Sequence, residues 1–334
     1  MSTFNISIII PCYNSANTVL DTFSSIKCQS ASSLMTEIIF VDDGSTDDTS
    51  KIINRIIDQN YLNNFFIKLI RLNKNRGVSN ARNVGISQAK GDWIYFLDSD
   101  DCLNKEALLT FGKLIHSFNS YSLIAFSYFL KKGTQLISYK NGNLCDKTIN
   151  GTSFYKLLLS KKINLHISSI VLNRKFLVNN KITFISDQPI AEDLQFVIHC
   201  LFLSKKCYYS SFHCFTYQTD NSTAMHGYTK FTLEMAQSVN FLYRFFLNNG
   251  NYVGTDFCNF YTVIFFVYNL KLLFKSNSYS IKAVKFLLKH LFILHLNISP
   301  LNRKYYFILR IAQILPVKSY LRFLIWRSHF EQKD

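Results

Sequence analysis

The sequence predicts an α/β fold in which a mainly parallel sheet is flanked by helices and followed by a C-terminal helical region. Three observations support this class. Short apolar, β-branched runs alternate with helical patterns over the first hundred residues, polar residues follow the predicted strands, and the pattern after residue 230 is helical throughout. The 334 residues suffice for one large or two moderate domains, and the 48% hydrophobic content excludes a disordered chain.

The first hundred residues contain four strand patterns separated by three helical ones. Runs such as ISIII and EIIFVD are short, apolar and β-branched, as buried parallel strands are. The second helix has Ser45 or Thr46 as an N-cap, acids in its first turn and isoleucines at helical spacing. In chain order we expect strand 6–10, helix 17–27, strand 37–42, helix 45–58, strand 66–72, helix 78–90 and strand 92–98.

The alternation is less regular between residues 101 and 220. Apolar periodicity there predicts helix 104–118, strand 122–130, helix 151–160 and helix 192–204. Further helices are expected near 230–248, 256–275, 280–296 and 301–328. We therefore divide the chain into an α/β domain, 1–225, and a helical region, 226–334.

The net charge of +16 lies mainly in the last third, where 14 Lys and Arg face four acids from residue 230 onward. Lys282, Lys285 and Lys289 share one helical face, as do Lys318 and Arg322, and apolar residues flank both sets. This pattern is typical of helices that lie on an anionic membrane surface. A helical subdomain packed on the rest of the chain, or on a second subunit in a homo-oligomer, is the alternative. No specific nucleic-acid module is present.

The eight cysteines form no CxxC pair, and several lie in apolar runs, so we expect a reduced, cytoplasmic protein. The N-terminus has no basic region before its short apolar run, which argues against a signal peptide. Lysines interrupt the two most apolar stretches, at Lys271 and Lys289, so a spanning helix is not expected.

The run YFLDSDD ends a predicted buried strand in three carboxylates. Ligands of open parallel sheets collect at the carboxyl ends of the strands, so we expect Tyr13 and Asn14, Asp42 and Asp43, and Asp98 and Asp100 to meet in one crevice. Carboxylates at such a point suit Mn²⁺ or Mg²⁺ together with substrate phosphates. Alternatively, Asp100 or Asp101 caps the next helix. VDDGSTDDTS lacks the ligand spacing of a calcium loop.

Three stretches together resemble family 2 glycosyltransferases of the GT-A fold, of the bacterial surface-polysaccharide type. They are SIIIPCYNSANTVLDTFSSIKCQS, EIIFVDDGSTDDT and NRGVSNARNVGISQAKGDWIYFLDSDD, in that order over the first hundred residues. The resemblance implies a nucleotide-sugar donor, usually a UDP-sugar, a divalent metal and inversion at the anomeric carbon. It places the nucleotide-sugar at Pro11, Tyr13, Asn14, Asp42, Asp43, Asn75, Arg82, Asp98 and Ser99, and the metal at Asp98 and Asp100.

Inverting transfer needs a general base beside the acceptor hydroxyl. Family members supply it from an acidic pair at a helix start, roughly 90 residues after the DxD motif, and PIAEDLQFVIHC offers Glu192 and Asp193 there. The resemblance implies Asp193 as base, supported by Glu192, although acids at a helix start also arise for stability alone. Ala191 stands where the family commonly has Gly. In the loop 217–227, His226 or Ser222 is expected near the phosphates or the metal.

The resemblance thus implies a transferase that adds a sugar to a hydroxyl of a growing cell-surface glycan, such as lipopolysaccharide, O-antigen or capsule. Its acceptor is a glycan or a lipid-linked glycan, and its expected location is the inner face of the cytoplasmic membrane. The alternatives are a teichoic acid or protein acceptor, and a catalytically silent nucleotide-binding scaffold. A nucleotidyltransferase is disfavoured because PCYNSANT is not a glycine-rich phosphate loop.

Overall fold

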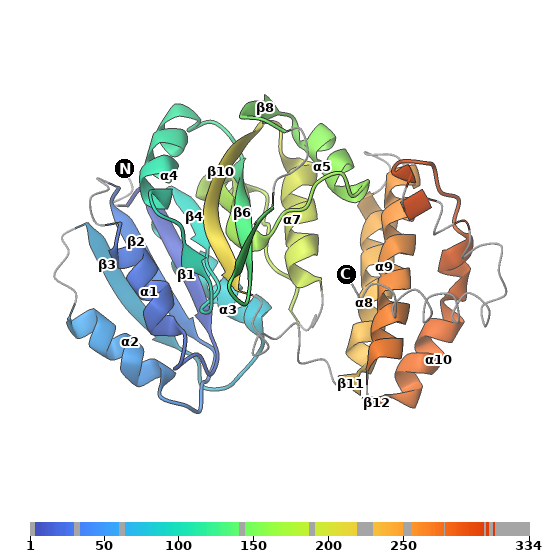
Figure 1. The fold of residues 1–334 in the computed structure, drawn as a ribbon, viewed down its shortest axis with the longest axis horizontal. Coiled ribbons are helices and arrows are strands. Elements are labelled where there is room, and N and C mark those ends of the chain that lie inside the picture. The colour runs from blue at the N-terminus through green and yellow to red at the C-terminus, as the bar shows by residue number, and fades with distance from the viewer. Residues whose placement is uncertain are drawn as a thin grey trace. The chain divides into compact units, whose positions relative to one another are not determined.

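The computed structural model describes residues 4–29, 34–59, 64–139, 144–186, 191–218, 230–249, 255–276, 278–303, 305–306 and 310. These residues form two compact units. The first comprises 1–155, 164–187 and 192–223, and the second comprises 156–163, 188–191 and 224–334. Figure 1 shows a sheet covered by helices in the first unit and helices in the second. None of the eight cysteines, all of which lie among the described residues, forms a disulfide bond.

The sheet of the first unit is mixed but mainly parallel. Strands β1, β2, β3 and β4 run parallel, β6 and β10 are parallel to each other, and β9 is antiparallel to its neighbours β4 and β6. The strand order is β3 (Phe65–Arg71), β2 (Thr36–Asp42), β1 (Ile6–Cys12), β4 (Trp93–Phe96), β9 (Ile170–Asn173), β6 (Leu123–Lys132), β10 (Cys207–Gln218) and β5 (Cys102–Leu103). The predicted α/β class with a mainly parallel sheet is confirmed.

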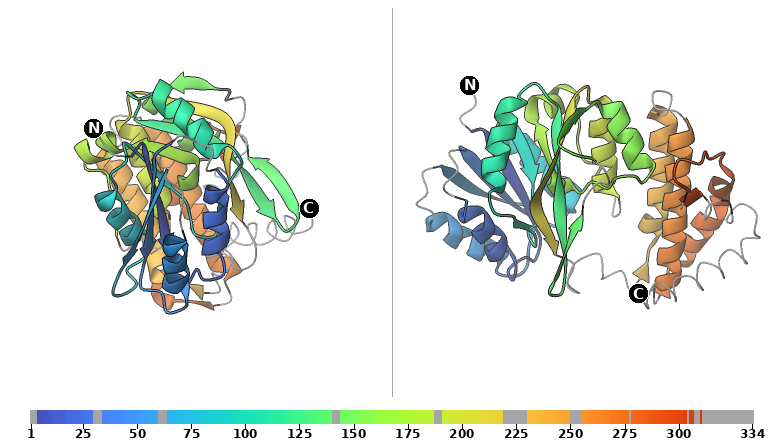
Figure 2. Two further views of the ribbon diagram at one scale, coloured as in Figure 1. Left: turned by 90° about the vertical axis from the view of Figure 1, so that its left-hand side faces the viewer. Right: turned by 45° about the horizontal axis from the view of Figure 1, so that its top comes forward.

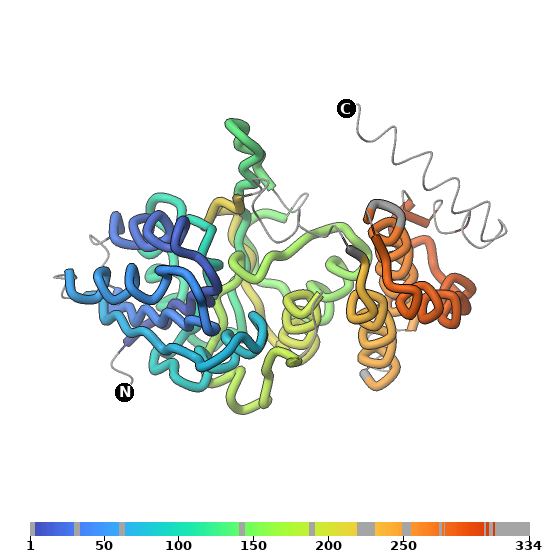
Figure 3. The backbone as a smooth tube through the Cα atoms, turned by 90° about the horizontal axis from the view of Figure 1, so that it is seen from below, coloured from blue at the N-terminus to red at the C-terminus, as the bar shows by residue number. Residues whose placement is uncertain are grey.

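Two further strands extend this sheet. Strand β7 (Gln135–Tyr139) forms a hairpin with β6, and β8 (Lys147–Ile149) pairs with β10. Figure 2 and Figure 3 show the β6–β7 hairpin extending beyond the rest of the sheet. Strands β5, β7, β8, β9 and β10 and the short helix α6 (Arg174–Asn179) are absent from our sequence prediction, which also begins or ends several other elements one to three residues away.

Helices cover both faces of the sheet, as the alternation of side chains along β1 shows. Ile8 and Ile10 belong to a core shared with α1 (Val19–Lys27), α2 (Thr49–Asp58) and α4 (Ala107–Ser117). On the opposite face Ile9 lies so close to Gly85 of α3 (Val78–Gln88) that a Cβ there would stand 2.3 Å from it. Phe96 contacts Phe196 of α7 (Glu192–Leu203) with ring centroids 5.9 Å apart. Thus α3 and α7 share this second face.

The second unit is built around α8 (Leu233–Asn249), which packs against α9 (Thr255–Lys275) and α10 (Ile281–Lys289). A 3₁₀ helix, Leu291–His295, follows α10 where we expected one helix over 280–296. The short strands β11 (Lys230–Phe231) and β12 (Ser278–Tyr279) pair with each other. Helix α5 (Gly151–Leu159) begins in the first unit and ends in the second. Lys318 and Arg322 lie outside the described residues.

None of the described helices combines the length and the apolar composition that a bilayer-spanning helix requires.

Candidate functional site

The loops that follow β1 and β2 are bonded to each other at the carboxyl ends of these strands. The backbone N–H of Asn14 donates to Ser45 Oγ at 2.9 Å, and the N–H of Thr46 donates to Asn14 Oδ1 at 2.9 Å. Asn14 has φ +50°, a left-handed conformation that asparagine tolerates better than most residues. Pro11 lies within β1, whereas Tyr13 is 48% exposed. The expected proximity of the first two polar groups is therefore present.

Asp42 and Asp43 are both buried, and their carboxylates hold the surrounding loops. Asp42 is 0% exposed, and its oxygens accept hydrogen bonds from Ser45 N at 2.9 Å and from the Ser50 hydroxyl. Asp43 accepts hydrogen bonds from the backbone N–H of Gly77, at 2.7 Å, and from the backbone N–H of the residue before Gly77. Bonded in this way, the two carboxylates shape the crevice, and Asp42 presents no accessible oxygen to a ligand.

Gly44 explains how these loops can approach so closely. It has φ +72°, and a Cβ at this position would lie 2.7 Å from the carbonyl carbon of Lys74. Glycine adopts this conformation without steric cost and leaves room for the neighbouring backbone. Asn75, in the same neighbouring loop, is exposed and accepts a hydrogen bond from Gly77 N at 2.9 Å.

Arg82 lies at the centre of the carboxylate groups. Its side chain is only 3% exposed, and its Nη2 donates to Asp98 Oδ1 at 2.7 Å. Its Nη1 donates to Asp193 Oδ1 and lies 4.0 Å from a Glu192 oxygen. One guanidinium from α3 therefore connects the carboxyl end of β4 with the start of α7. Arg82, which lies 111 residues before Asp193 in the sequence, thus brings the predicted donor-site acid and the predicted general base together.

Aromatic packing holds the guanidinium in place. The Arg82 Cζ atom lies 5.3 Å from the centre of the Phe184 ring, a cation–π geometry. Phe184 in turn stacks on Phe196 of α7 with centroids 3.9 Å apart. The Nε atom of Arg82 is buried and has no hydrogen-bond partner among the described residues.

Burial, the neighbouring acids and Arg82 shift the pKa values of these acids in different directions. Burial raises the pKa of Asp193, with Arg82 acting in the opposite direction. The pKa of Glu192 rises to about 7 through burial and the neighbouring Asp193 charge. Although burial opposes ionisation of Asp98, Arg82 lowers its pKa. Burial and Asp98 raise the pKa of Asp100 to about 6. The site therefore holds both a firmly ionised carboxylate and carboxyls that take up protons near neutrality.

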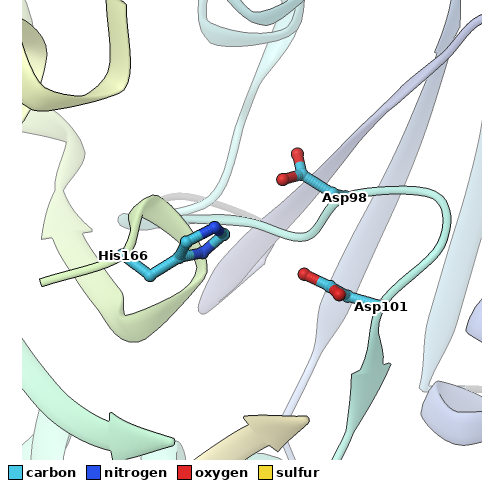
Figure 4. A group of neighbouring side chains, drawn as sticks. All are labelled: Asp98, Asp101 and His166. Carbon is cyan, nitrogen blue, oxygen red and sulfur yellow. The ribbon is translucent and has the colours of Figure 1, made fainter. Parts of the chain in front are cut away.

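Asp98, Asp101 and His166 form a group whose potential metal-ligand atoms all lie within 4.8 Å of one another. Figure 4 shows their side chains directed toward one another. Asp101 Oδ1 accepts from Gln218 N at 3.1 Å, but its buried Oδ2 has no hydrogen-bond partner in the part of the chain that the structure describes. A buried carboxylate oxygen without a partner is costly, and two carboxylates with one imidazole suit Mn²⁺. The residues present therefore fit a divalent cation.

Asp100, which we expected as a metal ligand beside Asp98, is not a member of this group. Ser99, between them, has its Oγ 2.7 Å from Ser15 Oγ, and its carbonyl accepts from Thr22 Oγ1. Ser99 thus ties the DxD segment to the loop that follows β1. The expected residue His226 lies outside the described residues, as does Ser222.

His166 was missed by sequence reasoning as a member of the site. It precedes a one-turn 3₁₀ helix, Ile167–Ser169, and its Nδ1 accepts from Ser168 N at 3.2 Å. The sequence around it, NLHISSI, contains no motif that distinguishes it from an ordinary loop histidine. Asp101 carried a signal, because it is one of the three carboxylates of the YFLDSDD run, but we did not name it as a metal ligand.

The acidic pair begins α7 as expected, directly after Ala191. Ala191 has φ +65°, in the left-handed region that favours glycine. The glycine that is common before this pair therefore has a conformational reason, and alanine occupies the same backbone conformation here at a steric cost.

Comparison with known proteins identifies relatives of this fold and sequence. An uncharacterised glycosyltransferase of Haemophilus influenzae is 35% identical over 159 residues, covering 48% of this chain and 54% of the relative. The poly(ribitol-phosphate) β-N-acetylglucosaminyltransferase TarS of Staphylococcus aureus is 34% identical over 119 residues, 35% of this chain and 20% of TarS. The matches therefore span about half the length of the first relative and a fifth of the second.

Among solved structures, the S. aureus TarS fragment 1–349 in complex with UDP-GlcNAc superposes with a TM-score of 0.63. The match covers 95% of this chain and 89% of that one at 17% identity, so it shows a shared fold. The profile described as "Glycosyl transferase family 2" matches residues 7–178, just over half of the 334 residues. The chain therefore belongs to glycosyl transferase family 2.

Proposed function

We propose that this protein is an inverting glycosyltransferase that moves a sugar from a UDP-sugar to a hydroxyl of a cell-surface glycan. The observation that carries the proposal is the shared guanidinium of Arg82. It holds Asp98, from the DxD motif, and Asp193, at the acidic pair, on two of its nitrogens. Acids with independent roles on the surface would not be expected to bind the same buried guanidinium. A transferase, in contrast, needs its donor site and its general base next to each other.

In the proposed reaction the acceptor hydroxyl oxygen attacks the anomeric carbon of the donor sugar. Its proton passes to a carboxylate oxygen of Asp193, while the bond from the anomeric carbon to the diphosphate breaks and its electron pair leaves with UDP. A base with a raised pKa accepts this proton more readily near neutral pH, which is the direction that burial gives to Asp193. Glu192, with a pKa of about 7, would support it or bind the acceptor.

A divalent cation, Mn²⁺ or Mg²⁺, would offset the negative charge that develops on the leaving diphosphate. Asp98 and Asp101, with His166, would hold it, and Asp100 stays a predicted ligand on the same loop. We propose that Tyr13, Asn14, Ser99 and Asn75 line the nucleotide-sugar. Asp42 and Asp43 would act indirectly, by positioning the loops that face the uridine, because both are buried and hydrogen-bonded.

Arg82 would serve as a positioning residue rather than a nucleotide ligand. Two of its nitrogens donate to carboxylates, its third nitrogen, Nε, is buried, and the side chain as a whole is only 3% exposed. Through these contacts it would set the distance between the metal-binding acid and the base.

The acceptor we propose is a hydroxyl of a growing surface glycan, free or linked to lipid. The relatives support this class in general terms, since TarS is named for transfer to poly(ribitol-phosphate), a teichoic acid polymer. A teichoic acid acceptor therefore stands beside lipopolysaccharide, O-antigen and capsule. A lipid-linked acceptor would place the protein at the inner face of the cytoplasmic membrane.

The proposal is tested by combining calorimetry with a transfer assay. UDP and UDP-GlcNAc are titrated into the protein with Mn²⁺, with Mg²⁺ and with EDTA, and donor hydrolysis and transfer are measured in parallel. We expect Asp193→Asn to retain UDP binding and to lose at least 100-fold in turnover, as removal of a general base does. Asp58→Asn, at the exposed end of α2, is the matched control and should change neither.

Two outcomes would contradict the proposal in different ways. UDP binding by a folded protein that never turns over, under any donor and metal, would indicate a scaffold. The absence of nucleotide binding with or without metal would remove the donor site itself.

A further inference from the structure

Helix α10 and the residues that flank it carry large apolar side chains on the outside of the second unit. Ile281 is 68% exposed, Leu288 54%, Phe292 48% and Tyr279 58%. The other side of the same helix is buried, with Ala283 and Leu287 at 0% and 2% exposure, and packs toward α8. The apolar stripe is therefore additional to the face that this helix already uses for packing.

The stripe is continuous and bordered by positive charge. Ile281 and Leu288 are seven residues apart and so lie on the same side of the helix, two turns from each other. Lys282, Lys285 and Lys289, spaced three and four residues apart, are exposed beside them. We call these three lysines with Tyr279, Ile281, Leu288 and Phe292 the α10 surface.

No acid of the neighbouring sequence compensates the lysines. Residues 278–303 contain no Asp or Glu, and among the described residues none of the three lysines forms an ion pair. The acids on the two long helices of the unit lie at their first turns, Glu234 on α8 and Asp256 on α9. Asp256 already accepts a hydrogen bond from the Ser299 hydroxyl at 2.6 Å.

We propose that the α10 surface binds the anionic leaflet of a lipid bilayer. Exposed apolar side chains beside a row of lysines match the bilayer interface, where the apolar groups enter the acyl boundary and the ammonium groups reach the lipid phosphates. Isoleucine and leucine would gain nothing from the phosphates of a nucleic acid, which makes lipid the better partner. In this mode of binding, α10 lies along the surface of the leaflet.

This inference does not depend on the donor chemistry, and it gives a lipid-linked acceptor a physical route to the protein. A transferase held at the leaflet meets its acceptor by diffusion in two dimensions. Loss of vesicle binding would leave UDP binding and Asp193-dependent donor hydrolysis unchanged, because neither needs a membrane-bound acceptor, so failure of either proposal can be recognised separately.

The test is co-sedimentation of the full chain with vesicles of phosphatidylcholine alone and of phosphatidylcholine with phosphatidylglycerol. We expect binding only to the anionic vesicles, weakened by salt. Each lysine near an anionic surface is worth about 1 kcal/mol, or about fivefold in affinity, so changing Lys282, Lys285 and Lys289 to Gln should weaken binding roughly 100-fold. Ile281→Ser with Leu288→Ser should weaken it by at least tenfold.

Matched variants separate this surface from the general positive charge of the protein. Changing Lys27, Lys113 and Lys175 of the first unit to Gln removes the same charge and should cost less than tenfold. Val178→Ser, at a residue 56% exposed in the first unit, is the apolar control and should have no effect. Phe292→Trp should gain fluorescence that brominated phosphatidylglycerol quenches, whereas Val178→Trp should not.

Three results would overturn the proposal. One is a folded protein that fails to sediment with anionic vesicles. Another is equal loss of binding in the two lysine variants, which would indicate diffuse charge. The third is a sedimenting dimer that Ile281→Ser with Leu288→Ser converts to monomer without changing vesicle binding, which would assign the surface to a second copy of the chain.

Discussion

Removing the Arg82 guanidinium should destabilise the protein strongly, because this one cation compensates several buried carboxylates. In Arg82→Met, Asp98 and Asp193 lose their charge-assisted hydrogen bonds and remain in a largely buried environment. Breaking a buried ion pair by removing one partner costs about 3 to 5 kcal/mol. The lost cation–π contact with Phe184 adds about 0.5 to 2 kcal/mol. We therefore expect a loss of roughly 4 kcal/mol in the free energy of unfolding at pH 8.

The penalty should shrink in acid, and this pH dependence distinguishes the electrostatic explanation from a packing defect. Without Arg82 the lowered pKa of Asp98 should rise and the raised pKa of Asp193 should rise further. The folded variant then takes up protons that the unfolded chain, with ordinary aspartate pKa values, does not bind. Proton uptake by the folded state stabilises it as the pH falls. Urea unfolding of parent and variant at pH 5.5 and pH 8 measures the change.

The control for this prediction is Arg71→Met. The Arg71 side chain is 61% exposed, and its Nε lies 3.6 Å from Asp42, so its removal should cost less than about 1 kcal/mol. A cost for Arg82→Met of under 1 kcal/mol, or one that is the same at both pH values, would refute the reasoning. Arg82→Lys keeps the charge but cannot donate to two carboxylates in a fork, so its stability should lie between parent and Arg82→Met.

Three further predictions follow from the same region. Ala191→Gly should raise the free energy of unfolding by about 1 kcal/mol, because φ +65° strains alanine and not glycine; unchanged or lower stability in thermal unfolding would contradict this. The pKa of Glu192 in the folded protein, about 7, is higher than that of a glutamate in the unfolded chain. The free energy of unfolding of the parent should therefore fall as the pH rises from about 4.5 to about 7, and Glu192 should account for on the order of 3 kcal/mol of this loss. Glu192→Gln should flatten that slope, and an unaltered slope in urea unfolding would rule out the residue as its source. His166→Ala should weaken Mn²⁺ binding about tenfold, measured by electron paramagnetic resonance without substrate; equal affinity would exclude the imidazole as a ligand.

The amino-acid sequence by itself determined the α/β class and the position of the chemistry along the chain. Both depend on local patterns. Apolar runs such as ISIII give strands whichever residues later surround them, and polar residues directly after these strands meet at one edge because parallel strands end there. The acidic pair at the start of α7 was expected instead from the resemblance to the family, which places such a pair at a helix start roughly 90 residues after the DxD motif.

The tertiary structure decided which of these residues contact one another. Arg82 and Asp193 are 111 residues apart, and only the packing of α3 and α7 on the same face of the sheet brings them together. The tertiary structure also buries Asp42 against Ser45 and Ser50 and places His166 beside Asp98 and Asp101. The strands from β5 to β10 that our prediction missed are mostly short or antiparallel and are stabilised by partners distant in sequence. Contacts of this kind depend on the whole fold. The free energy gained when two side chains distant in sequence share one buried environment cannot be inferred from the local sequence around either of them.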